Sequence, residues 1–215
     1  MPGAHTQASQ TSQAPLSQDE LQLLRSFPSE PEVLAEASGE GVAVFRLDRG
    51  DNAGLVYWLG TRGYLRAFRS PMSFGQLNVS SYPGMASGSE DAVVSRVTRE
   101  CRTAEAPGCW LCVDVGRSRA LRPTHIRVTH GSPLAGRDMT SWALEGRDTA
   151  TSQWTRVKAL PTLRSQHASA TVPVDAGSLM FSQVRLVSTG PQMDGNHALH
   201  ISDLELFGCL FLVKP

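Results

Sequence analysis

The segment Thr124-His125-Ile126-Arg127-Val128-Thr129-His130 alternates apolar side chains with polar ones. Successive side chains of a β-strand point to opposite faces of the sheet, so this alternation is typical of a strand buried on one face. Ile126 and Val128 share a face with Thr124 and His130, and we expect Ile126 and Val128 to point into a core. The segment therefore predicts a half-buried strand.

Short runs of similar character lie on both sides of this segment, separated by Gly, Pro, Ser and Asp. That rhythm predicts an antiparallel all-β sandwich. The stretch 81–108 is unusually long for a connection in a compact domain, and we expect it to be a functional loop. The runs predicted as strands are Val42–Leu47, Leu55–Leu59, Leu77–Ser80, Trp110–Val115, His125–Thr129, Ser141–Glu145, Trp154–Lys158, Ala168–Val174, Val184–Ser188 and Leu204–Phe207.

The residues before the first strand differ in composition from the rest. Residues 1–16 are polar and low in complexity, which predicts a disordered tail. The capping box Ser17-Gln18-Asp19-Glu20, followed by Leu21, Leu24 and Phe27 at helical spacing, predicts a short helical extension over residues 17–40. The sandwich is then expected over residues 41–210, with a C-terminal tail over 211–215.

Charge and apolar content restrict the possible partners and locations. Lys+Arg and Asp+Glu both number 20, so the chain has no overall field that would attract nucleic acid, and we expect no nucleic-acid partner. Residues 1–15 lack the apolar core of a secretory signal, which predicts a cytoplasmic or nuclear protein. In that setting the four cysteines are expected to stay reduced and to be buried rather than to form disulfides or a zinc site.

Catalytic and metal-binding motifs are missing from the sequence. The six histidines form no H-x-x-x-H or H-E-x-x-H pattern, and there is no G-x-S-x-G elbow and no glycine-rich phosphate loop before a helix. We read Asp114 as a structural strand-end carboxylate and expect Trp58, Trp110, Trp142 and Trp154 to belong to the core. The sequence thus predicts no enzyme, no cofactor and no metal.

Several further short sequence motifs occur, and their order along the chain is informative. Val79-Ser80-Ser81 is followed by Gly108-Cys109-Trp110-Leu111-Cys112-Val113-Asp114-Val115-Gly116, and Leu204-Glu205-Leu206-Phe207-Gly208-Cys209 closes the series. Together they resemble the coagulation-factor type C, or discoidin, family. This resemblance implies a galactose-binding-like, jelly-roll β-sandwich over residues 77–209.

An earlier segment extends the resemblance to residues 42–209. The stretches 45–48 and 55–61 are similar to an extra strand pair in the intracellular version of this domain, found in large ubiquitin ligases and some BTB proteins. Secreted members tie the closing cysteine to one at the start of the domain, but no cysteine precedes Cys101 here. This difference favours the intracellular version.

The resemblance also suggests where a ligand binds. In the family the ligand meets loops at one end of the sandwich, which correspond here to residues 82–91, 102–107 and 130–139. Bulky aromatic pairs of the kind that anchor secreted members to membranes are missing there, so we expect no membrane binding. The candidate contact residues are Tyr82, Met85, Arg102, His130, Leu134 and Arg137.

Two functions remain open for these loops. The first is a protein-interaction module that captures a peptide or folded partner, with a role as adaptor or substrate receptor in the ubiquitin pathway by analogy alone. The alternative is a lectin-like module for a carbohydrate or an anionic ligand, for which Tyr82, His130 and Arg137 would have to converge.

Arginines also cluster in two segments, Arg62/Arg66/Arg69 and Arg96/Arg99/Arg102. If the second segment is helical, its arginines form a basic stripe suited to an acidic peptide or phosphate. The alternative is a solvated, partly paired surface, because Glu90, Asp91, Glu100 and Glu105 are close in the sequence.

Overall fold

The computed structural model describes residues 43–212, except residues 98, 117, 133, 135, 166 and 167. The predicted tail over 1–16 and the predicted helical extension over 17–40 lie outside the described residues. Within the described part of the chain, no helix has the length and apolarity needed to cross a membrane.

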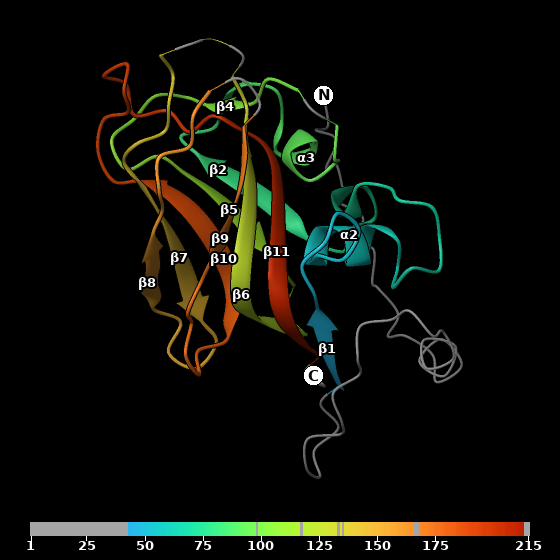
Figure 1. Cartoon of the computed structure of the whole chain (residues 1–215). Coiled ribbons are helices and arrows are strands. Elements are labelled where there is room, and N and C mark those ends of the chain that lie inside the picture. Colours follow the sequence, from blue (N-terminus) through green and yellow to red (C-terminus); the bar gives the residue numbers. More distant parts are fainter. Residues whose placement is uncertain are drawn as a thin grey trace, which may run out of the picture. The chain divides into compact units, whose positions relative to one another are not determined.

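Most of the described chain forms antiparallel strands (Figure 1). Three short helical elements accompany them: α2 (Leu55–Gly60), the 3₁₀ helix η1 (Pro71–Phe74) and α3 (Glu90–Val93). The strands are β1 (Ala43–Leu47), β2 (Asn78–Tyr82), β3 (Met85–Ser87), β4 (Arg102–Thr103), β5 (Trp110–Asp114), β6 (Arg119–His130), β7 (Trp142–Asp148), β8 (Trp154–Ala159), β9 (Ser169–Pro173), β10 (Phe181–Ser188) and β11 (Ile201–Leu212).

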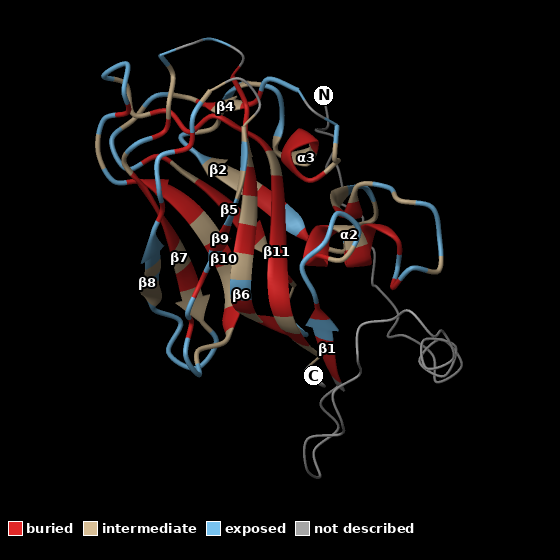
Figure 2. Ribbon diagram, in the orientation of Figure 1, coloured by how far each residue is buried: buried red, intermediate tan, exposed pale blue. Residues whose placement is uncertain are grey.

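The strand pairings define two layers. One layer has the order β2-β5-β10-β7-β8 and the other the order β1-β11-β6-β9; they join where Phe181 pairs with Leu121. Buried residues follow the strands of both layers (Figure 2). Ile126 and Val128 are buried in this core, as the alternation predicts. The predicted all-β sandwich is confirmed, and β11 continues past the boundary expected at residue 210.

One predicted strand is wrong: residues 55–59 form helix α2. Its first turn is capped by Glu205 of β11, whose carboxylate accepts the N–H groups of Val56 at 2.6 Å and Tyr57 at 3.1 Å. A short apolar run fits a buried helix as well as a strand, so the sequence could not separate the two. Burial raises the pKa of Glu205 to about 7, and the N–H groups that it accepts oppose that shift.

The predicted long loop over 81–108 is also partly ordered into elements. It contains β3, α3 and β4, and the side chain of Ser89 caps α3 by accepting the N–H of Ala92. The basic stripe that Arg96, Arg99 and Arg102 would form in a helix is not present. Helix α3 ends at Val93, and Arg96 has a φ of 59°, outside the right-handed helical region.

The structural roles expected of single residues are mostly found. Asp114 accepts the N–H of Gly116 at 2.8 Å and the side-chain amide of Gln183 at 2.8 Å, which confirms its structural role. Trp58 and Trp142 belong to the core, whereas the expectation is wrong for Trp110 and Trp154, which are only half-buried.

The cysteine side chains are mainly buried. Cys101, Cys109 and Cys112 are buried free thiols, and Cys209 is half-buried. Burial raises the pKa of Cys112 to about 12, with Asp114 adding to the effect. Such a thiol is a poor nucleophile at neutral pH, because the thiolate is the reactive form.

Candidate functional site

The strand register gathers several connections at one end of the sandwich. Tyr82 lies opposite Trp110, Trp110 lies opposite Val187, and His130 lies opposite Ile201. The connections that follow β2, β6 and β10 therefore share one edge of the fold, near the label β4 in Figure 1. We call residues 83–109, 131–141 and 189–200 the loop end.

The connections of the loop end are hydrogen-bonded to one another. The side-chain oxygen of Gln192 accepts the N–H groups of Thr140 at 2.7 Å and Ser141 at 3.2 Å. The hydroxyl of Thr103 accepts the N–H of Leu199 at 3.0 Å, which ties the first connection to the third. A surface held in this way loses less conformational entropy when it binds a ligand.

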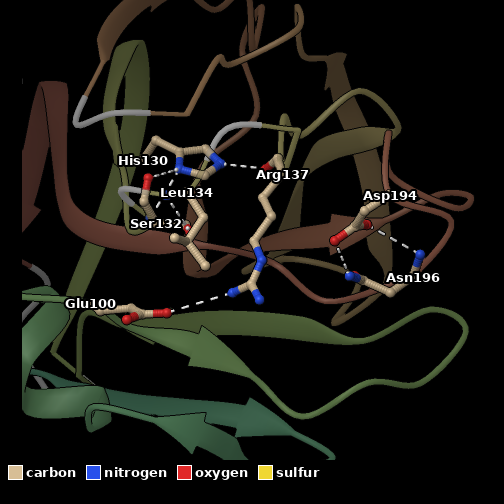
Figure 3. A network of polar contacts seen from close by, with 7 residues as sticks. All are labelled: Glu100, His130, Ser132, Leu134, Arg137, Asp194 and Asn196. Atoms are coloured by element: carbon tan, nitrogen blue, oxygen red, sulfur yellow. Dashed lines mark hydrogen bonds and ion pairs between the residues drawn. The ribbon is translucent and has the colours of Figure 1, made fainter.

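The ring of His130 supports the second connection, residues 131–141, through hydrogen bonds to its backbone. Its Nε2 donates to the carbonyl oxygen of Arg137 at 2.8 Å, and its Nδ1 accepts the N–H of Ser132 at 3.0 Å (Figure 3). Because a carbonyl can only accept, Nε2 carries a proton. The ring thus holds both ends of the segment 132–137. It is fully buried, which corrects the expectation that the loop presents His130 to a ligand.

A second buried histidine stacks on the first. The rings of His130 and His200 are 5.5 Å apart and 10° from parallel. Among the described residues, neither ring nitrogen of His200 has a hydrogen-bond partner. Burial lowers the pKa of His200 to about 4, and His130, Arg137 and Arg102 lower it further. His200 is therefore neutral at physiological pH.

Arg137 carries a partly exposed positive charge near His200. Its side chain is 30% exposed, and Nη1 lies 3.7 Å from the Oε1 of Glu100. Asp194 and Asn196 form a hydrogen-bonded turn in the third connection, beside this pair in Figure 3. Guanidinium, carboxylate and amide groups of the loop end thus offer both donors and acceptors.

Apolar side chains lie at the same end. Tyr82 is 49% exposed and its ring stacks with that of Trp110, with centroids 6.2 Å apart. Leu134 and Met193 are 51% and 65% exposed. Large exposed apolar side chains grouped with a few polar groups are typical of binding surfaces.

The predicted contact residues therefore divide into three groups. Tyr82 and Leu134 are exposed; Met85, Arg102 and Arg137 are half-buried; and His130 is buried. Arg102 pairs with His200 through an isolated bridge, which places it at the loop end.

The third connection was missed by the sequence reasoning, although it contributes Met193, Asp194 and Asn196. The turn sequence Asp194-Gly195-Asn196 was its only local signal. No group of His, Cys, Asp and Glu side chains within the described residues could hold a metal ion.

Comparison with known proteins finds similarity in structure only. No family model and no curated protein sequence matches the chain. Among solved structures, the family 32 CBM of Clostridium perfringens NanJ in complex with galactose is 13% identical, with a TM-score of 0.50 over 61% of this chain and 93% of that one. A second C. perfringens CBM32, in complex with GalNAc-β-1,3-galactose, is 10% identical, with a TM-score of 0.50 over 62% of this chain and 96% of that one.

A vertebrate lectin is similar to the same degree. The fucolectin from striped bass (Morone saxatilis) serum is 13% identical, with a TM-score of 0.50 over 62% of this chain and 45% of that one. Identities this low show the fold alone. The described chain therefore has the galactose-binding-like β-sandwich fold, the same fold as these carbohydrate-binding modules and this lectin.

Proposed function

We propose that this chain is a non-catalytic binding module whose loop end takes a carbohydrate. The observation that carries the proposal is the placement of Arg137, which the buried His130 holds at its backbone while its guanidinium stays partly exposed beside Glu100. Sugar hydroxyls both donate and accept, so they suit a surface that combines Arg137 with Glu100 and Asn196. The fold is one on which solved structures hold galactose and GalNAc-β-1,3-galactose.

A pair of arginine variants tests the proposal. Arg137 and Arg156 each lie near a glutamate, at 3.7 Å and 3.6 Å, but Arg156 lies on β8, away from the loop end. We expect glycan-array and calorimetric binding of galactose-containing glycans to be lost in Arg137→Gln and retained in Arg156→Gln. Equal binding by both variants, or no glycan bound by the wild type, would overturn the proposal.

A second candidate is recognition of a protein or peptide by the same loops. The exposure of Leu134 and Met193 favours it, because apolar side chains, Met among them, are enriched in the buried centre of protein interfaces. A Leu134→Ser/Met193→Ser variant should weaken a protein ligand and leave glycan binding intact. The adaptor role in the ubiquitin pathway and the cytoplasmic or nuclear location stay predictions, since none of the similar structures bears on them.

A further inference from the structure

A second surface lies beside α2, where Arg96 of the connection 83–109 stacks on the rings of Tyr57 and Phe68. The segment 61–70 that follows α2 exposes Arg62, Arg66 and Arg69. Within the described residues, none of these three arginines has a carboxylate within ion-pair distance. We call Arg62, Arg66 and Arg69 the arginine face.

The backbone that carries the arginine face is fixed to the end of α2. Arg66 donates its N–H to the carbonyl of Thr61 at 2.9 Å, and Arg69 donates its N–H to that of Gly60 at 3.1 Å. The ring of Phe68 packs so closely on Gly60 that a Cβ there would overlap it. The three guanidinium groups are thus carried by a defined segment.

An aromatic cluster supports this segment. The rings of Tyr57 and Phe68 are parallel within 3°, with centroids 5.7 Å apart, and the guanidinium of Arg96 lies over both, at 4.8 Å and 5.7 Å. Nη1 of Arg96 is buried and has no hydrogen-bond partner among the described residues. The guanidinium of Arg62 lies 5.1 Å from the ring centre of Phe74. Ring contacts of this kind hold guanidinium planes in place.

Backbone strain is concentrated at the same place. Arg62, Tyr64 and Arg96 have φ values of 53°, 69° and 59°. Residues with side chains rarely adopt this left-handed region, and such strain gathers at functional sites. In the described chain, Ser152 is the one other non-glycine residue with a positive φ.

The nearby carboxylates of Asp91 and Glu90 accept hydrogen bonds from serine hydroxyls. Asp91 accepts the hydroxyl of Ser70, and Glu90 accepts the hydroxyl of Ser81 at 2.7 Å. The whole chain has no net charge, so the positive charge of the arginine face is local. A local set of unpaired arginines is complementary to an equally local set of acidic groups.

We propose that the arginine face binds an acidic peptide segment of a partner protein. Arginine presents a planar, forked set of donors that matches a carboxylate with two hydrogen bonds. Single-stranded nucleic acid requires a series of exposed rings for base stacking, and at this surface Tyr64 is the exposed large ring, at 37%. The peptide is therefore the occupant that the observations favour.

The test measures fluorescence anisotropy of the full chain with a short fluorescein-labelled polyglutamate peptide. A polyglutamine peptide of the same length controls for charge, and a labelled single-stranded oligonucleotide represents the other class of polyanion. We expect polyglutamate to bind, more weakly at high salt, and polyglutamine not to bind. The variant Arg62→Gln/Arg66→Gln/Arg69→Gln should weaken polyglutamate binding about tenfold or more.

A matched variant separates the surface from overall charge. Arg46→Gln/Arg156→Gln/Lys158→Gln also removes three positive charges, but from β1 and β8, and its affinity should stay within about twofold of wild type. Arg137→Gln should likewise bind the peptide normally, whatever its effect on glycans. Should the arginine-face variant fail to melt cooperatively, Arg66→Gln replaces it, because no ring contact involves Arg66 in the described chain. Absent polyglutamate binding, equal losses in the two triple variants, or tighter binding of the oligonucleotide would each overturn the proposal.

Discussion

The carboxylate of Glu205 accepts the backbone N–H of Val56 at 2.6 Å, although 149 residues separate the two in the chain. The contact makes a buried acid on β11 the cap of helix α2. Because burial raises the pKa of Glu205 to about 7 from its usual 4.5, the folded state holds a proton that the unfolded state releases between these values. Glu205 therefore contributes stability that is fully present below pH 4.5 and is lost as the pH rises through 7.

Replacing Glu205 by glutamine should remove this dependence. From pH 4.5 to pH 7, we expect the stability of Glu205→Gln relative to wild type to increase by roughly 3 kcal/mol, since one pKa unit corresponds to about 1.4 kcal/mol. Urea denaturation at both ends of this range measures the change. A constant difference between the two proteins would show that Glu205 does not titrate in the folded state.

Gly54 should be required next to this carboxylate. A Cβ at Gly54 would overlap the carboxyl group of Glu205, whereas a Cβ at Gly50 would meet Ala53 at an ordinary 3.6 Å. Gly54→Ala is therefore expected to cost about 1–3 kcal/mol of unfolding free energy, as overpacked sites do. Gly50→Ala serves as the control and should change stability by about 0.5 kcal/mol or less. Similar melting temperatures for the two variants would contradict the close approach.

His200 should impose the opposite pH dependence. Its pKa is lowered from 6.5 to about 4. Between these pH values the unfolded state binds a proton at this residue and the folded state does not, so the free energy of unfolding falls as the pH drops from 6.5 to 4. Phenylalanine keeps a flat ring for stacking on His130 and does not titrate. As the pH falls from 6.5 to 4, we expect the stability of His200→Phe relative to wild type to increase by roughly 3 kcal/mol, measured by circular-dichroism melts. A difference that does not vary with pH would rule out the titration.

His130 should act on the loop rather than on the ligand. His130→Ala leaves the N–H of Ser132 and the carbonyl of Arg137 without their ring partner. We expect faster amide hydrogen exchange over residues 132–137, with β7 and β10 still protected, and weaker glycan binding although Arg137 is unchanged. Asparagine at this position, which keeps a donor and an acceptor, should recover part of the protection. Unchanged exchange in the segment would remove the positioning role.

The strands could be predicted from the sequence because alternation and turn residues are local signals. Helix α2 could not, since its cap is Glu205, and nothing near Leu55 indicates that contact. The burial of His130 could have been predicted from the sequence, because the alternation places it on the face of Ile126 and Val128. The family resemblance instead assigned it to the ligand.

The loop end was only partly predictable for a related reason. The resemblance pointed to Leu134 and Arg137, which lie in the second connection, and to Tyr82, which ends β2 at the same edge of the fold. The third connection, residues 189–200, is held at the loop end by the hydrogen bonds of Gln192 to Thr140 and Ser141. No local sequence pattern indicates these bonds. The absence of carboxylate partners around Arg62, Arg66 and Arg69 is likewise a property of three-dimensional packing alone.

The position of β11 also bears on how the chain folds during synthesis. This strand pairs with β1 on one side and β6 on the other, and through Glu205 it completes α2. Until residues 201–212 leave the ribosome, β1 and β6 lack their shared neighbour and α2 lacks its cap. The nascent sandwich therefore keeps an open edge until β11 is synthesised, and this strand then joins the early and late parts of the domain.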